Sequence, residues 1–224
     1  MSLRVIAIDG PAGSGKSTTA RAVAERLDLA HLDSGALYRA VTLAYLDSGI
    51  QFGEQQIVGL ARSLPVRLRL VAGRFRPEVA GVDVSSEIRS DRVTARASEV
   101  SALPQVRQWV NHELRQAAEN HPRGVVIDGR DIGTVVFPDA AVKVFLTAEN
   151  EERARRRLLQ LGRSADAASV SQTVRAIDER DRKDSTRAVA PLTRAEQAVV
   201  LDTTDLGFAE QVERVVALVR KAFS

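Results

Sequence analysis

The sequence predicts an α/β fold built on a doubly wound, five-stranded parallel sheet, and three observations support this prediction. Five apolar runs have the length and composition of buried parallel strands, at residues 5–8, 30–32, 125–127, 142–146 and 199–201. Helical patterns lie between these runs and end the chain, from about residue 208 to residue 223. A glycine-rich segment joins the first run to the first helical pattern. In such a fold, a ligand is expected at the carboxyl ends of the strands.

The segment after the first strand matches the pattern Gly-x4-Gly-Lys-Ser/Thr at every required position, with the residues Gly10, Pro11, Ala12, Gly13, Ser14, Gly15, Lys16 and Ser17. The helical pattern then begins at Thr18. Such a loop surrounds a phosphate chain with backbone N–H groups at the positive end of a helix dipole. Lys16 is expected to reach the β- and γ-phosphates, and the Ser17 hydroxyl is expected to bind Mg²⁺. The alternative is a glycine-rich turn that matches by accident.

The second strand is followed by Asp33-Ser34-Gly35-Ala36-Leu37-Tyr38-Arg39. Ser34 is placed either to cap the helix that begins there or to bind an acceptor phosphate. Arg39 lies about one turn further along and would join the same phosphate, or else it is solvated. The sequence leaves these alternatives open.

Residues 64–84 break the alternation of parallel strands and helices. Val66, Leu68 and Leu70 alternate with Arg67 and Arg69, which predicts a small antiparallel sheet inserted between two parallel strands. Helices are predicted after it, at about residues 91–103 and 105–119, divided by Pro104.

The third strand is followed by Asp128-Gly129-Arg130-Asp131. An acid directly after a buried strand resembles the Walker B position, which holds Mg²⁺ directly or through water. Arg130 would then lie between the donor and acceptor phosphates. An Asp-Gly turn alone does not require the two further charges.

The helix after the fourth strand begins with the charged run Glu151-Glu152-Arg153-Ala154-Arg155-Arg156-Arg157. Charge pairs at i,i+4 favour a solvated helix surface. The same segment lies where a lid would close over a triphosphate, and Arg153 and Arg157 would then stabilise charge in the transition state. We predict the lid. A further basic cluster, with Arg180 and Arg187, lies before the last strand.

The composition favours a cytoplasmic protein that binds small anions. The formal net charge is only +3, from 32 basic and 29 acidic residues, and the basic residues are interleaved with acids. This argues against a nucleic-acid-binding stripe. The longest apolar runs are too short to cross a bilayer, and the first strand begins at once, so neither a membrane span nor a signal peptide is expected. The absence of cysteine excludes disulfides.

Taken together, these motifs resemble the bacterial cytidylate kinases, from about residue 4 to residue 222. The resemblance is carried by IDGPAGSGKS at 8–17, LDSGALYR at 32–39, DVSSEIR at 83–89, DGRDIGTVVFPDA at 128–140 and RAVAPL at 187–192. It implies one domain over residues 1–224, and a monomer. That domain would comprise a core (about 1–60, 121–147 and 166–224), a nucleoside-monophosphate-binding insert (about 61–120) and a lid (about 148–165).

The resemblance also implies that the γ-phosphate of ATP is transferred to CMP or dCMP in the presence of Mg²⁺. Residues 10–18 would bind ATP, and Ser17 and Asp128 would bind the metal. The groups implied at the reacting phosphates are Lys16, Asp128, Arg130, Arg153 and Arg157. Those implied for CMP are Asp33, Ser34, Tyr38, Arg39, Ser98, Arg107, Arg130, Asp131, Arg180, Asp184 and Arg187. Within this set, Ser98, Arg107 and Asp131 would contact the cytosine edge, with Arg187 near it, while Arg180 and Asp184 would face the sugar.

Three other functions compete with this interpretation. A kinase for AMP or UMP would differ in acceptor choice. A P-loop switch protein would hydrolyse nucleotide without an acceptor, although the guanine-reading Asn-Lys-x-Asp stretch is absent. A nucleic-acid-binding protein would show steeply salt-dependent binding.

Overall fold

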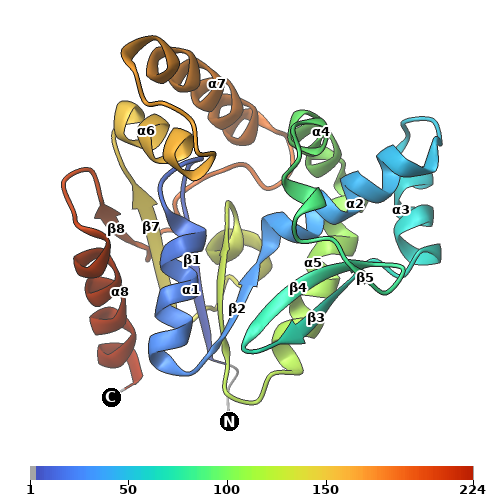
Figure 1. Cartoon of the computed structure of the whole chain (residues 1–224). Helices are drawn as coiled ribbons and strands as arrows, with labels where there is room; N and C mark the ends of the chain where they lie inside the picture. Colours follow the sequence, from blue (N-terminus) through green and yellow to red (C-terminus); the bar gives the residue numbers. More distant parts are fainter. Residues whose placement is uncertain (1–3, 224) are drawn as a thin grey trace.

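The computed structural model describes residues 4–223 and contains a single twisted sheet covered by helices on both faces (Figure 1). The strands are β1 (Val5–Asp9), β2 (Ala30–Asp33), β3 (Arg67–Val71), β4 (Arg74–Val79), β5 (Val82–Asp83), β6 (Val125–Gly129), β7 (Val142–Thr147) and β8 (Val199–Asp202). Their order is β3-β4-β2-β6-β1-β7-β8, with β5 paired to β4. Strands β2, β6, β1, β7 and β8 are mutually parallel, so the predicted five-stranded parallel core is confirmed.

Eight α-helices and two single helical turns connect these strands within the described residues. The helices are α1 (Lys16–Leu27), α2 (Ser34–Ser48), α3 (Glu54–Ser63), α4 (Asp91–Ala102), α5 (Pro104–Glu119), α6 (Asn150–Gln160), α7 (Ala167–Thr186) and α8 (Phe208–Phe223). The turns are the 3-10 helix η1 (Glu87–Arg89) and the π-helical turn η2 (Ile132–Val136). Pro104 is the first residue of α5, a position where the missing N–H of proline costs no helical hydrogen bond.

The two faces of the sheet are buried against different helices. On one face, Ile6 and Ile8 of β1 pack with Val23 of α1 and Val215 of α8. On the other face, the alternate β1 residues Val5 and Ala7 belong to the cluster formed with α2, α4 and α5. Because successive side chains of a strand point to opposite faces, a strand that is apolar at every position is buried on both sides. This layering fixes the carboxyl ends of β1, β2 and β6 side by side.

The inserted antiparallel strands β3, β4 and β5 were expected as a small sheet of their own. They are paired antiparallel to one another, as predicted, but a parallel bridge between His31 and Arg74 joins β4 to β2. The insert therefore extends the main sheet instead of standing apart from it. Among the described residues, no helix is long and apolar enough to cross a membrane.

Candidate active site

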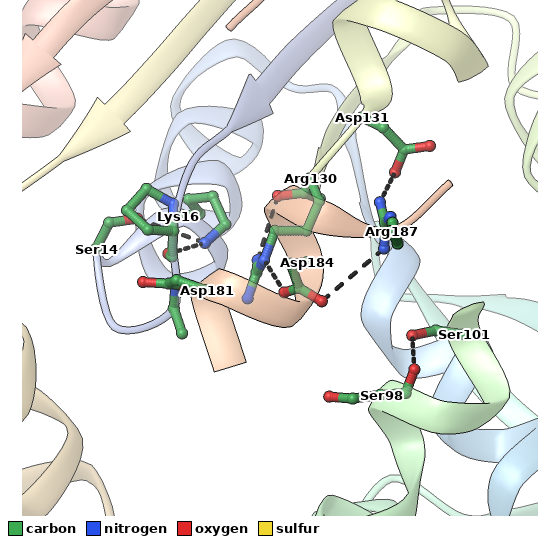
Figure 2. Close-up of polar contacts among 12 residues, drawn as sticks. Ser14, Lys16, Ser98, Ser101, Arg130, Asp131, Asp181, Asp184 and Arg187 are labelled. Atoms are coloured by element: carbon green, nitrogen blue, oxygen red, sulfur yellow. Dashed lines mark hydrogen bonds and ion pairs between the residues drawn. The ribbon is translucent and has the colours of Figure 1, made fainter. Parts of the chain in front are cut away.

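A cavity of about 590 Å³ opens over the carboxyl ends of β1, β2 and β6. Its walls come from the glycine-rich loop, the start of α2, helix α4, the end of α6 and helix α7. Most of the polar residues singled out from the sequence contribute to this one cavity. Figure 2 shows how Lys16, Arg130, Asp184 and Arg187 gather around it.

The glycine-rich loop packs too tightly for side chains at two of its glycines. A Cβ atom on Gly10 would lie 2.0 Å from the carbonyl oxygen of Leu146, and one on Gly13 would lie 2.8 Å from that of Arg153. Both glycines also have positive φ angles, of 149° and 76°. The loop is therefore held between β7 and α6, with its turn leading into the N-terminus of α1.

Lys16 is not an exposed loop cation. Its side chain is buried and turns back on the loop, where the ammonium donates to the carbonyl oxygen of Pro11 at 2.6 Å (Figure 2). Burial, together with the nearby positive charge of Arg130, lowers the pKa of Lys16 well below its usual value. An incoming phosphate would give this ammonium a direct anionic partner in place of the Pro11 carbonyl oxygen.

Ser17 and Asp128 meet at the base of the cavity. The Ser17 hydroxyl donates to Oδ2 of Asp128 at 2.5 Å, and Oδ1 of Asp128 lies 2.8 Å from Nε2 of His31. Burial opposes ionisation of Asp128, but the hydrogen bond and charge of His31, the hydrogen bond from Ser17 and the charge of Lys16 together outweigh it, so the pKa of Asp128 is lowered. Burial opposes protonation of His31 in turn, but the hydrogen bond to Asp128 and the nearby negative charges raise its pKa. The carboxylate is thus held charged beside the loop that would receive phosphates.

The start of α2 answers the question left open for Ser34. Asp33 is the N-cap, because its Oδ1 accepts from the N–H of Ala36 at 3.1 Å, while the Ser34 hydroxyl donates to the carbonyl oxygen of Asp128 at 2.8 Å. Ser34 therefore does not cap the helix. Arg39 lines the cavity and is not simply solvated, and burial lowers its pKa to about 10. Asp33 and Ser34 also line the cavity.

Asp131 lies buried between two arginines. Its Oδ2 lies 2.5 Å from a guanidinium nitrogen of Arg107, and its Oδ1 lies 3.4 Å from one of Arg187. The Arg107 guanidinium also lies over the ring of Tyr38, with its central carbon 5.2 Å from the ring centroid. Burial raises the pKa of Tyr38. These four residues form a polar wall with a fixed carboxylate and fixed guanidinium donors.

Arg130 links the phosphate end of the cavity to α7. Its Nε donates to Oδ2 of Asp184 at 3.0 Å, and Asp184 also lies 3.9 Å from Arg187 (Figure 2). Arg180, one turn earlier on α7, lines the same cavity, and burial followed by the charge of Arg130 lowers its pKa to about 10. The cavity thus concentrates positive charge that suits phosphates.

The arginine-rich helix α6 divides into two parts with different environments. Arg157 lines the cavity. Arg153 does not line it: the side chain is buried against the glycine-rich loop, donating to the carbonyl oxygen of Ala12 at 2.8 Å and pairing with Asp181. The structure thus places Arg153 against the loop and outside the cavity wall, away from the position expected for it at the reacting phosphates. Its half of the helix is packed on the glycine-rich loop in this structure.

Ser98 also departs from its expected position. Helix α4 lines the cavity with Asp91, Thr94, Ala97 and Ser101, while Ser98 is not among the lining residues. The Ser101 hydroxyl donates to the carbonyl oxygen of Ser98 at 3.1 Å (Figure 2). The two serines are about one helical turn apart on α4, and the sequence pattern does not distinguish which of them faces the cavity.

Two acids of this region were given no role from the sequence. Asp181 accepts a hydrogen bond from the N–H of Ala12 at 2.8 Å, and Asp9 accepts two from the start of η2. The spacing of Asp178, Asp181 and Asp184 along one helix was an available signal for the first. Asp9 had the same signal as Asp128, an acid at the end of a buried strand.

Comparisons with known proteins agree along almost the whole chain. The family model described as cytidylate kinase matches residues 6–221. The cytidylate kinase of Yersinia enterocolitica serotype O:8 / biotype 1B is 43% identical, over 97% of this chain and 94% of that protein. That of Enterobacter sp. strain 638 is 45% identical, over 97% and 95%. That of Desulfitobacterium hafniense strain Y51 is 46% identical, over 95% and 91%.

Proposed function

The chain belongs to the cytidylate kinase family, and from this premise we propose that its cavity transfers the γ-phosphoryl group of ATP to CMP or dCMP. The O–P bond between the β- and γ-phosphates breaks, and a new one forms to the acceptor phosphate. The products are ADP and CDP or dCDP. The cavity volume of about 590 Å³ lies within the usual range for sites that bind small molecules.

The observation that carries the choice of base is the buried Asp131 between Arg107 and Arg187. Cytosine offers an amino donor beside ring acceptors, so a carboxylate next to guanidinium donors complements its edge. Uracil presents a carbonyl oxygen where cytosine has the amino group. That oxygen would face the Asp131 carboxylate and leave a buried polar group unpaired, which is strongly unfavourable.

The remaining acceptor contacts follow from the cavity wall. Arg39 and Arg130 would bind the acceptor phosphate, with Ser34 beside them. Arg180 and Asp184 would lie near the sugar, since both are on the stretch of α7 that faces Arg130. Guanidinium groups suit this task because they form forked hydrogen bonds to phosphate oxygens.

The donor side would use the glycine-rich loop, Lys16 and Arg157. Phosphoryl transfer depends mainly on positioning and on neutralising negative charge, so these cations would stabilise the transition state without a general base. Lys16 would exchange the Pro11 carbonyl oxygen for phosphate oxygens when ATP binds.

Ser17 and Asp128 are the groups that would hold Mg²⁺. Their two oxygens are in contact and both line the cavity, and oxygen ligands are what this ion prefers. Among residues 4–223 no three acidic, histidine or cysteine side chains converge as a complete metal cage, so the ion would share its coordination with ATP phosphates and water. When bound, it would neutralise charge on the β- and γ-phosphates.

A coupled assay with ATP, Mg²⁺ and a panel of nucleoside monophosphates tests the proposal. CMP and dCMP should give much higher kcat/KM than UMP or AMP, and hydrolysis without acceptor should be slow. Preference for UMP or AMP would assign a different kinase. Rapid hydrolysis without any acceptor would favour a switch protein.

A further inference from the structure

We propose that Asp9 is a positioning residue, which fixes Asp131 through the π-helical turn η2. This proposal rests on the proposed function, because Asp9 would support the carboxylate that would recognise CMP. Asp9 is 5% exposed, at the end of the central strand β1, and does not line the cavity.

The Asp9 carboxylate binds two consecutive backbone N–H groups. Its Oδ1 accepts from the N–H of Ile132 at 2.9 Å, and its Oδ2 accepts from that of Gly133 at 2.8 Å. These are the first two residues of η2, whose N–H groups have no partner inside a helical turn. A Cβ atom on Gly133 would lie 3.4 Å from Oδ2 of Asp9 and 3.3 Å from the stem of Lys143, so this residue is closely packed on both sides.

The π-helical turn η2 also fixes the backbone of Asp131, the residue directly before it. The carbonyl oxygen of Asp131 accepts from the N–H groups of Val135 at 2.9 Å and Val136 at 3.1 Å. The backbone of Asp131 is therefore tied to η2, while its side chain reaches Arg107 and Arg187. Any movement of the first residues of η2 would move the carboxylate that is proposed to read cytosine.

The far end of η2 is held by a second charged side chain. Arg115 of α5 donates to the carbonyl oxygens of Val136 and Val135, each at 3.0 Å. The single turn is thus bound by Asp9 at its start and by Arg115 at its end. Arg115 is exposed, so it can be replaced without opening the core.

The charges around Asp9 come from three elements. Asp131 precedes η2, Lys16 begins α1, and the stem of Lys143 on β7 lies against Gly133. Replacing Asp9 by asparagine keeps the shape but turns an amide N–H₂ toward one of the two N–H groups. One hydrogen bond is lost and two donors face each other, which would displace the turn.

The test measures kcat/KM for CMP and for UMP, together with the KM for ATP, in wild type, Asp9→Asn and Arg115→Ala. Asp83→Asn is the matched control, because Asp83 also accepts from a backbone N–H, that of Ser85, but on the exposed insert. Asp9→Asn should lower kcat/KM for CMP by about tenfold or more, as one unmade buried hydrogen bond would. The CMP-to-UMP ratio should fall, with the KM for ATP nearly unchanged.

Arg115→Ala should reduce the same ratio by a smaller factor, and Asp83→Asn should leave it unchanged. An unaltered CMP-to-UMP ratio in Asp9→Asn would overturn the proposal, as would equal losses toward ATP and CMP. If Asp9→Asn does not fold, Arg115→Ala decides: a reduced ratio supports the positioning role, and an unchanged ratio overturns it. Failure of the proposed function is distinct, because wild type itself would then not prefer CMP.

Discussion

Arg153 of α6 and Asp181 of α7 form an ion pair that binds both polar groups of a single residue, Ala12 of the glycine-rich loop. The arginine donates to the carbonyl oxygen of Ala12, and the aspartate accepts from its N–H group, each at 2.8 Å. The Arg153 side chain is 6% exposed. Helices α6 and α7 lie more than a hundred residues after the glycine-rich loop in the sequence. The pair holds the loop against these two helices and so fixes the loop before any nucleotide binds.

Breaking this pair should therefore weaken ATP binding and destabilise the protein. Arg153→Gln leaves Asp181, whose side chain is only 15% exposed, with one partner fewer, which costs about 3 kcal/mol of the free energy of unfolding. The KM for ATP should rise more than the KM for CMP. Urea unfolding and steady-state kinetics measure the two effects. Arg155→Gln is the control, because its pair with Glu151 in the same helix is exposed and contributes little. Equal behaviour of the two variants would contradict the role of the pair.

Lys16→Ala should abolish most of the transfer with little effect on the fold. Its ammonium is buried with a lowered pKa, so its removal takes away transition-state stabilisation but no large share of stability. The expected loss in kcat is about 100-fold or more. Lys143→Ala is a close control, because Lys143 also donates to the carbonyl oxygen of a proline five residues earlier. A folded Lys16→Ala enzyme with near-normal kcat would rule out the phosphate role.

Asp131→Asn should narrow the preference for CMP over UMP. An amide presents a donor where the carboxylate only accepts, so uracil gains a partner and cytosine loses one. We expect about a tenfold or larger fall in the CMP-to-UMP ratio of kcat/KM. Asp139→Asn, an exposed acid eight residues later, should leave the ratio unchanged. Wild-type ratios in Asp131→Asn would remove Asp131 from base recognition.

Because of Asp9, the stability of the folded protein should depend on pH, with the contribution of this residue falling as the pH rises. Burial raises its pKa in the folded state to about 6 from an ordinary value of 3.8. Between these values the folded protein binds more protons than the unfolded chain, so this group's contribution to stability is full at low pH and falls as the pH rises. The unfolding free energy of wild type minus that of Asp9→Asn should fall by about 2 kcal/mol between about pH 4 and about pH 7. A constant difference would show that the pKa is not raised.

Hydrogen exchange should divide the segment that the sequence predicts to be a lid. Residues 151–157 include the Arg153 anchor, so their amides should be protected without ligand. Residues 159–166 lie beyond the anchored part of α6, and the side chains of Leu159 and Arg163 are exposed there. Their amides should therefore exchange fast. ATP and CMP analogues added together should slow them more than either alone. High protection of residues 159–166 without ligand, unchanged by both, would mean a fixed charged surface.

The sequence determined the parts of this protein that are local. The order of strands and helices, the glycine-rich loop, and the acids after the second and third strands follow from patterns a few residues long. These patterns act through backbone geometry and hydrogen bonding between near neighbours. They were sufficient for the α/β fold and for the family resemblance, because the motifs at 8–17 and 128–140 are both local and specific.

Only the tertiary structure decided which partners the charged side chains have. Asp9 meets Ile132 across 123 positions of sequence, and Ala12 meets Asp181 across 169. Arg153 and Arg157 are four residues apart on one helix, yet one is buried against the loop and the other lines the cavity. A run of arginines carries no information on this point. Burial and pairing depend on how β1, β6 and α7 are brought together by packing, and that arrangement is a property of the whole chain.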